Sequence, residues 1–281
     1  MKLTAAETAQ LNALCKKFRI DVLTVLHEKQ TGHPGGSLSV CEILTTLYFK
    51  EMNISPKNMD DPDRDRFVMS KGHSVEAYYA VLAAKGFFPM EEVIEKFSKF
   101  GSPYIGHPNN KLPGIEMNSG SLGHGLPVCV GMALAGKMDK KDYRVYTVMG
   151  DGELAEGSVW EGFMAGHQYK LDNLCAIVDR NRLQISGNTE DVMKQDSQEE
   201  RWAAFGWNVL SVPGNDMDAL VHAFELAKHC KGKPTVIIAN TTKGCGSSVM
   251  ENKAEWHHKV PTPEEVEQIM KDLDERKEAL S

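Results

Sequence analysis

The stretch "YRVYTVMGDGELAEGSVWEG", residues 143–162, decides the fold class. It begins with a short apolar, β-branched run, turns on two glycines around Asp151, and continues into a segment that we expect to be a helix over 153–169. Similar apolar runs follow at "NLCAIVD", "WNVLSV" and "PTVIIAN", and helical patterns separate them. This alternation predicts βαβ crossovers and a parallel sheet that is buried on both faces. We therefore predict an α/β protein with a doubly wound, open parallel sheet and helices on both faces.

The N-terminal half reads as helices joined by glycine-rich turns. A helix is expected over residues 5–29, because apolar residues recur there at helical spacing. The turns "TGHPGGSLS", "SKGHSVEAYYA" and "NSGSLGHGL" each lead into a helical pattern, and we expect Ser37 or Ser39 to cap the helix after the first turn. A brief strand is expected at "FVMS", and a helix end at Gly86.

Length and charge limit the class of protein. The 281 residues, 41% of them apolar, can bury one large core, so we expect a single domain over 1–281 with a charged helical tail over 262–281 at the surface or against a partner. The net charge of −7 argues against binding to nucleic acid or an anionic membrane. No apolar run could span a bilayer and no secretory signal is present, so a cytoplasmic location is expected. Six scattered cysteines without a C-x-x-C pair predict buried free thiols.

Two polar side chains follow neighbouring strands of the predicted sheet. Asp151 comes after the first strand and Asn181 after the next, at the edge where open α/β sheets bind ligands. Gly150 and Gly152 would let the backbone approach a phosphate, which Asp151 would repel unless a cation lay between them. Carboxylate, amide and carbonyl oxygens suit Mg²⁺, with Ca²⁺ as the alternative. The GDG turn alone also fits a plain helix cap.

These motifs, taken in order, resemble a known family. A "GDG" followed about thirty residues later by a strand-terminal asparagine resembles the thiamine diphosphate motif. "TGHPGGSLS", "SKGHSVEAYYA", "GHP" at 106–108, "SGSLGHGL" and "WHH" at 256–258 resemble the diphosphate-binding portion of transketolases over nearly the whole chain. The resemblance implies the thiamine diphosphate-binding fold, in its diphosphate-type domain. No G-x-x-x-x-G-K-[ST] loop competes with this interpretation.

The resemblance implies a set of cofactor and metal contacts. The divalent metal would be ligated by Asp151, Asn181 and the backbone carbonyl of Leu183. The diphosphate would be contacted by Gly152, His73 and His257, with Asn181 beside it. The aminopyrimidine would be approached by Gly120 and Leu122. His258 stands where relatives more often carry glycine, which leaves open which imidazole of the doublet faces the phosphate.

The resemblance also implies catalytic roles for three histidines and one glutamate. His33 and His107 would line the substrate channel, and together with His73 they would bind hydroxyl groups and move protons, because imidazole titrates near neutral pH. On the helix expected after GDG, Glu156 would lie at a subunit interface beside its symmetry mate. The implied reaction is transfer of a two-carbon ketol unit from a ketose phosphate to an aldose phosphate.

The pyrimidine-binding domain of transketolases has no counterpart before Ser281. We therefore expect the N-terminal subunit of a split transketolase, active with a separate C-terminal subunit in an α2β2 complex. Three alternatives stay open: a deoxyxylulose phosphate synthase-like subunit, an oxo-acid dehydrogenase α-like subunit, and a non-catalytic regulatory subunit. Pentose phosphate sugars are the expected substrates, with a specialised catabolic sugar as the other possibility.

Overall fold

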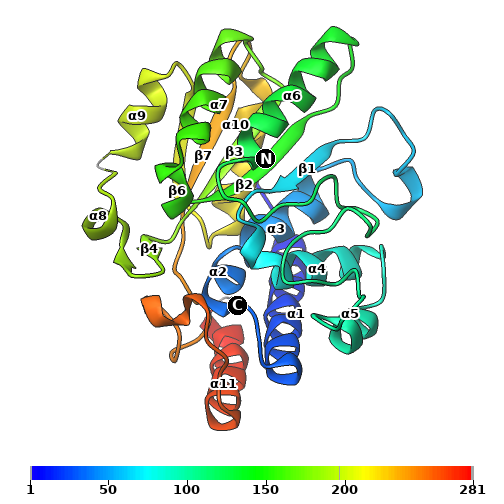
Figure 1. Ribbon diagram of the computed structural model, residues 1–281, viewed down its shortest axis with the longest axis vertical. Coiled ribbons are helices and arrows are strands. Elements are labelled where there is room, and N and C mark those ends of the chain that lie inside the picture. The colour runs from blue at the N-terminus through cyan, green and yellow to red at the C-terminus, as the bar shows by residue number, and fades with distance from the viewer. Residues whose placement is uncertain (1, 196, 280–281) are drawn as a thin grey trace.

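The computed structural model describes residues 2–195 and 197–279 and is built around a five-stranded sheet (Figure 1). The strand order is β1-β2-β3-β7-β6, and every neighbouring pair is parallel. The strands are β1 (Arg66–Met69), β2 (Val145–Gly150), β3 (Leu174–Arg180), β6 (Asn208–Pro213) and β7 (Thr235–Asn240). A small antiparallel hairpin, β4 (Leu183–Gln184) and β5 (Gly187–Asn188), follows β3. The predicted open parallel sheet is confirmed.

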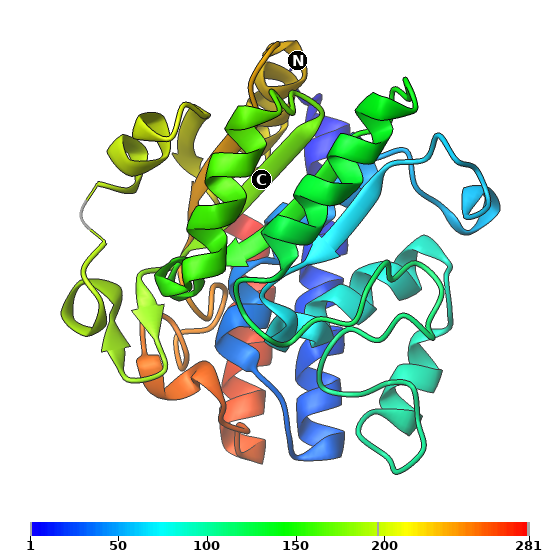
Figure 2. The ribbon, with the colours of Figure 1, turned by 45° about the horizontal axis from the view of Figure 1, so that its top comes forward.

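Helices cover both faces of the sheet. The α-helices of the described residues are α1 (Ala5–Lys29), α2 (Pro34–Ser39), α3 (Cys41–Thr46), α4 (Val75–Lys85), α5 (Met90–Lys96), α6 (Gly125–Met138), α7 (Gly157–Gln168), α8 (Thr189–Val192), α9 (Gln198–Ala204), α10 (Met217–His229) and α11 (Pro263–Ala279). Figure 2 shows α6 and α7 side by side on one face, with α1 and α11 on the other side of the molecule. Short helical turns join these elements: η1 (Leu47–Glu51), η2 (Pro56–Asn58), η3 (Gly72–Ser74), η4 (Gly152–Ala155) and η5 (Ala254–His257).

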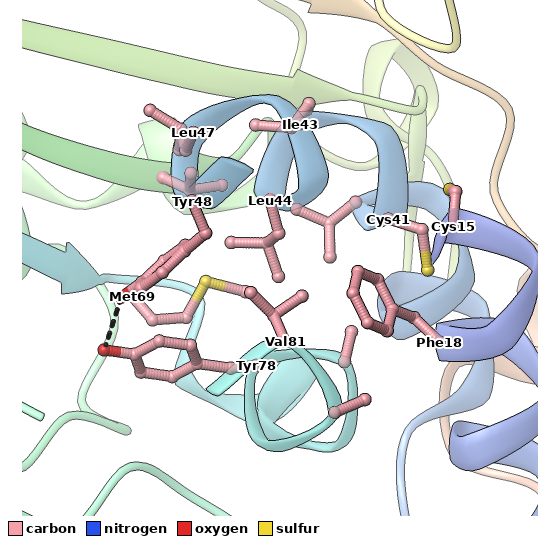
Figure 3. Close-up of a cluster of buried hydrophobic side chains, with 14 of the residues drawn as sticks. Cys15, Phe18, Cys41, Ile43, Leu44, Leu47, Tyr48, Met69, Tyr78 and Val81 are labelled. Carbon is pink, nitrogen blue, oxygen red and sulfur yellow. Dashed lines mark hydrogen bonds between the residues drawn. The ribbon is translucent and has the colours of Figure 1, made fainter. Parts of the chain in front are cut away.

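The sheet divides the core into two layers, because successive side chains of a strand point to opposite faces. Tyr146 and Val148 of β2 pack with the helices around α1, α3 and α4, whereas Val145 and Met149 pack with α6 and α7. Figure 3 shows part of the first layer, where side chains of α1, α3 and α4 meet under the sheet and the hydroxyl groups of two buried tyrosines pair at 3.2 Å. Both faces of the sheet are therefore buried, as the apolar strands predict.

Residues near the ends of several helices explain where those helices begin or end. α1 begins at a capping box between Thr4 and Glu7, and α4 ends at Gly86, which adopts φ 93° as expected for a glycine cap. The predicted cap at Ser37 or Ser39 is wrong, because α2 already begins at Pro34. Proline suits the first turn of a helix, where its missing N–H needs no partner.

The helix predicted over 153–169 is interrupted. Its first residues form the 3₁₀ turn η4, and α7 begins at Gly157. Between them Glu156 adopts an extended conformation, φ −73° and ψ 131°, and caps α7 instead of lying on it. The interruption turns Glu153 and Leu154 into the core, where both are buried.

The C-terminal helix α11 covers Pro263–Ala279 of the tail expected over 262–281, and residues 280–281 lie outside the described part of the chain. The helix lies at the surface, and one face of it packs on the core. Ile269 and Leu273 of α11 are buried in the same core layer as α1. Lys16 of α1 pairs with Asp274. Within the described ranges, no helix is both long and apolar enough to cross a bilayer. All six cysteines are free thiols, five of them buried, as predicted.

Candidate functional site

A pocket of about 360 Å³ lies at the carboxyl ends of β2 and β3. The two strands are in register, with Gly150 opposite Asp179, so the loops that leave them start side by side. The pocket is lined by Gly36, Lys71, His73, Leu122, Gly150, Asp151, Gly152, Glu153, Ala155, Asn181, Leu183, Gln184, Ile185, Ser186, Val192, Met193, Lys243 and His257. The place is the one at which open α/β sheets bind ligands.

The three predicted oxygen donors lie together in this pocket. Asp151 is 2% exposed, and its carboxylate accepts hydrogen bonds from the backbone N–H groups of Gly152, at 2.8 Å, and Arg182. Arg182 adopts a left-handed conformation, φ 67°, that turns the chain back toward β2. The Asn181 side-chain oxygen accepts from the N–H of Leu183 at 3.1 Å. The loop after β3 is thus folded onto Asp151.

Burial decides the electrostatics of Asp151. Burial, with a smaller contribution from the nearby Asp179 carboxylate, raises the pKa of Asp151 to about 6, although two backbone hydrogen bonds act to lower it. A divalent cation beside the carboxylate would favour its charged form. The carboxylate of Asp151, the amide oxygen of Asn181 and the carbonyl of Leu183 are hard ligands of the kind that Mg²⁺ binds.

A buried ion pair lies beneath the pocket. Lys71, 1% exposed, pairs with Asp179, 0% exposed, and also donates to the carbonyl of Gly36 at 3.1 Å. Asp179 accepts further hydrogen bonds from Ser39, at 2.6 Å, and Thr241. The sequence interpretation missed this pair. Its signal was a carboxylate at the end of an otherwise apolar strand, because a charge placed there needs a buried cation.

A second buried lysine was also missed. Lys243 is 2% exposed and lines the pocket, where its ammonium group lies 3.3 Å from the carbonyl oxygen of Leu183 and 3.1 Å from Nδ1 of His257. Burial, with the charge of Lys71, lowers the pKa of Lys243 to about 8. The signal was its place in a glycine-containing loop after β7, a strand that ends at the same edge of the sheet.

The predicted histidines form one cluster. The ring of His33 lies 5.4 Å from that of His73, 6.2 Å from that of His107 and 5.6 Å from that of His257, measured between centroids. Burial lowers the pKa of His33 to about 4 and that of His257 to about 3, and lowers the pKa of His73 and His107 as well. These imidazoles are therefore neutral at pH 7 and able to accept or donate a proton.

The two imidazoles of the doublet differ in place. His257 lines the pocket beside Lys243. His258 is exposed, and its ring lies 4.7 Å from that of His33. The geometry puts His257, and not His258, on the side of the candidate diphosphate site.

The remaining predicted residues are divided between the pocket and its surroundings. Leu122 and Gly152 line the pocket. Gly120, at φ 150°, lies against the imidazole of His107, where a Cβ would come within 3.0 Å of the ring. Glu156 is exposed outside the pocket, and its Cβ would be 2.6 Å from any Cβ at Gly123. Glu156 therefore belongs to the surface that joins the 119–125 turn to α7.

A cavity of this kind, at the carboxyl edge of an open parallel sheet, is built to hold a cofactor through an anionic group. Its donors converge on one place from the segments that follow β1, β2, β3 and β7 and from the turn η5. The fold and the site thus define a cofactor-binding domain of an α/β enzyme.

Comparison with known proteins narrows this class. The family described as "Transketolase, thiamine diphosphate binding domain" matches residues 11–278. The chain belongs to the transketolase family, a family of transferases, and comprises its thiamine diphosphate-binding domain. This confirms the family that the sequence motifs resemble.

Relatives of similar length are named as subunits of larger enzymes. One subunit of the apulose-4-phosphate transketolase from Phocaeicola vulgatus is 51% identical over 274 residues, covering 98% of this chain and 96% of that protein. A 6-deoxy-6-sulfo-D-fructose transketolase subunit from Clostridium sp. is 45% identical over 234 residues, covering 83% and 85%. The transketolase from Campylobacter jejuni superposes with a TM-score of 0.89 at 30% identity, covering 94% of this chain but 42% of that one. Similarity to these separate subunits agrees with the expected N-terminal subunit of a split transketolase.

Proposed function

We propose that this chain, with a separate C-terminal subunit, transfers a two-carbon ketol unit from a ketose phosphate to an aldose phosphate by means of thiamine diphosphate and Mg²⁺. The observation that carries the proposal is the convergence of Asp151, Asn181 and Leu183 with Lys243, His73 and His257 on one pocket. The alternatives within the cofactor class lose support, because the chain belongs to the transketolase family.

The donor set fits a divalent metal that bridges to a diphosphate. Asp151 supplies one negative charge, and Asn181 and the Leu183 carbonyl supply neutral oxygens at the end of the next strand. Burial disfavours the charged form of Asp151 and raises its pKa to about 6, so a cation beside the carboxylate would stabilise that charged form. Mg²⁺ is favoured over Ca²⁺, because Mg²⁺ is usually held by one or two carboxylates together with phosphate oxygens.

The opposite wall of the pocket fits the diphosphate. Lys243 provides a cation, and His73 and His257 provide neutral imidazoles that can donate an N–H to phosphate oxygens. The Gly152 backbone lies at the pocket, in the turn that follows β2. A volume of about 360 Å³ is within the range of small-molecule sites.

Bound thiamine diphosphate supplies the electron sink that lets a carbon–carbon bond next to a carbonyl break and form. The chain's own residues then act on the substrate hydroxyl groups. His33 and His107 are neutral, and their ring centroids lie 6.2 Å apart, so both can reach hydroxyl groups of one sugar and can accept or return a proton. The ring of His73 lies 5.4 Å from that of His33 and 5.0 Å from that of His257, so His73 is close to both the substrate histidines and the diphosphate side.

A second chain completes the site in this proposal. The chain spans 42% of the single-chain transketolase from C. jejuni, whereas it spans nearly all of the apulose-4-phosphate transketolase subunit from P. vulgatus. The partner would supply the pyrimidine-binding domain, including the glutamate that hydrogen-bonds the aminopyrimidine, and the basic residues that hold the sugar phosphate.

We place a homodimer contact on α6 and α7, giving an α2β2 complex. Val128 on α6 and Met164 on α7 are 36% and 55% exposed, on the two neighbouring helices that share one face of the sheet (Figure 2). Glu156 is the N-cap residue of α7 and is exposed. Apolar side chains exposed on adjacent helices are suited to burial against a second copy of the chain.

The substrate class is a ketose with an anionic group remote from its carbonyl. The relatives are named for apulose 4-phosphate and for 6-deoxy-6-sulfofructose, a phosphate and a sulfonate. Pentose phosphate sugars are the first substrates to test, and these two specialised sugars are the next. The location proposed for the enzyme is the cytoplasm.

The test is reconstitution with the C-terminal half expected in the adjacent reading frame. Ketol transfer from xylulose 5-phosphate, apulose 4-phosphate or sulfofructose should require both chains, thiamine diphosphate and Mg²⁺. Full activity of this chain alone would contradict the split enzyme, and turnover with pyruvate as donor would point to the synthase or dehydrogenase alternatives. In the complex, Asp151→Ala should abolish Mg²⁺-dependent cofactor binding by calorimetry; unchanged affinity would refute the metal assignment.

A further inference from the structure

We propose that Glu153 is a positioning residue that holds three glycine turns of the cofactor site in one arrangement, so that the wall at Leu122 and the metal-binding edge at Asp151 face each other at a fixed separation. The effect of Glu153 on cofactor binding rests on the proposed function, whereas its effect on the arrangement of the turns does not depend on that function.

Glu153 lies in η4, the turn after β2, and is 2% exposed. One carboxylate oxygen, Oε1, accepts the backbone N–H of Gly123 at 2.8 Å and the hydroxyl of Ser70. The other, Oε2, accepts the N–H of Gly150 at 3.0 Å. The Ser70 hydroxyl oxygen in turn accepts the N–H of Gly125 at 3.1 Å. Both oxygens of the carboxylate are thus occupied by donors of the protein itself.

The donors come from separate parts of the chain. Ser70 follows β1, Gly123 and Gly125 precede and open α6, and Gly150 ends β2. Each donor is next to a residue of the site: Ser70 precedes Lys71, Gly123 follows Leu122, and Gly150 precedes Asp151. A single side chain therefore fixes both walls of the pocket relative to each other.

The turns are packed too closely for another residue to replace this link. Gly123 adopts φ 85°, and a Cβ there would come within 2.6 Å of the Cβ of Glu156. A Cβ at Gly125 would overlap the side chain of Ser70. The N–H groups of Gly123 and Gly125 are buried, and a buried donor without an acceptor is costly.

The chemistry of the link requires a carboxylate. Glutamate offers acceptors on both oxygens, whereas glutamine offers one acceptor oxygen and one NH₂ donor. Whichever way a glutamine side chain is oriented, its NH₂ group faces the N–H of Gly123 or that of Gly150. Glu153→Gln therefore keeps the shape of the side chain but breaks the link between the two walls.

The first test uses the chain alone, by amide hydrogen exchange. In Glu153→Gln, amides of 119–125 and 150–152 should exchange about tenfold faster than in wild type, while the central residues of β3 and β7 keep their protection. Glu95→Gln, at an exposed glutamate of α5, is the matched control and should exchange as wild type does. Wild-type exchange of both turns in Glu153→Gln would overturn the proposal.

The second test uses the complex with the C-terminal subunit. Glu153→Gln should raise the thiamine diphosphate concentration for half-maximal activity about tenfold and the KM of the ketose donor by a smaller factor, because Glu153 bonds directly to the turns at the pocket and reaches His107 through Gly120 of the 119–125 turn. A rise in the donor KM together with unchanged cofactor affinity would refute the positioning role. Failure of Asp151→Ala to alter cofactor binding would instead refute the proposed function, leaving the exchange result standing.

Ser70→Ala keeps the proposal testable where Glu153→Gln does not fold. It removes one donor and leaves the bonds to Gly123 and Gly150, so a smaller effect on exchange, about threefold, is expected in the 119–125 turn. Where Glu153→Gln does fold, the two changes should be less than additive in a double-mutant cycle, because both remove the same contact. A Ser70→Ala chain that exchanges as wild type does, or strict additivity of the pair, would contradict the shared link.

Discussion

The carboxylate of Glu76 accepts the backbone N–H of His33 at 3.0 Å, which ties a candidate catalytic loop to helix α4. The second carboxylate oxygen accepts the hydroxyl of Ser37 at 2.7 Å. Glu76 is 0% exposed, and in the described part of the chain no Lys or Arg forms an ion pair with it. Because these two donors are neutral, ionisation of the buried carboxyl group should affect the loop that carries His33.

The first prediction concerns the pH dependence of stability. Burial raises the pKa of Glu76 to about 7, so the folded state binds a proton that the unfolded state releases near pH 4.5. The free energy of unfolding should therefore fall as pH rises from about 4.5 to about 7, by about 3 kcal/mol from this group. Glu76→Gln has no carboxyl to ionise, and its amide can still accept from His33 and donate to Ser37.

Urea denaturation at pH 5, 6, 7 and 8 checks this. Relative to wild type, Glu76→Gln should gain up to about 3 kcal/mol between pH 5 and pH 8. Glu95→Gln, exposed on α5, is the control and should run parallel to wild type. Parallel profiles for Glu76→Gln and wild type would show that the buried carboxyl does not titrate in this window.

The second prediction concerns Lys243. Lys243→Met keeps the buried stem and removes the cation, so affinity of the assembled enzyme for thiamine diphosphate should fall about ten- to hundredfold, whereas affinity for thiamine, which lacks the phosphates, should be unchanged. Because burial lowers the pKa of Lys243 to about 8, wild-type affinity should also decrease as pH rises through that value. Calorimetry with both ligands measures this. Lys141→Met, at a lysine paired with Asp63, is the control, and an equal loss for thiamine would contradict the charge role.

The fold and one part of the site were readable from the sequence. Alternating apolar runs predict a parallel sheet, and the carboxyl ends of parallel strands meet at one edge, so Asp151 and Asn181 could be placed together by their positions after two strands. The histidine cluster followed from glycine- and proline-containing turns that carry a family resemblance. These features depend on local pattern and strand direction, which a sequence displays.

Contacts between distant turns could not be read in this way. Lys71 and Asp179 are 108 positions apart, and Glu153 lies 83 positions from Ser70. No short-range sequence pattern therefore predicts either contact. The break of the helix at Glu156 was not predicted, because Glu153 and Leu154 are buried through packing against neighbouring turns and not through the local sequence pattern. Tertiary packing overrode a helical pattern there.

The third prediction separates the two imidazoles of the doublet. His257 lies 3.1 Å from the ammonium nitrogen of Lys243 at the pocket, so His257→Ala should weaken thiamine diphosphate binding about tenfold. His258→Gly should keep cofactor affinity within about twofold, because its exposed ring contacts His33 on the substrate side. Calorimetry of the two variants in the assembled complex measures the difference. The reverse order of effects would assign the diphosphate contact to His258.

The fourth prediction concerns the face formed by α6 and α7. Met164 is 55% exposed on α7, and the proposed homodimer would bury it against a second copy of the chain. Met164→Glu should therefore place an unpaired charge in the interface and convert the α2β2 complex into αβ units, as measured by sedimentation velocity. Leu226→Glu, a matched change at a 44% exposed leucine of α10, should leave the assembly intact. An α2β2 complex that persists in Met164→Glu at wild-type concentration would show that the two copies meet through another surface.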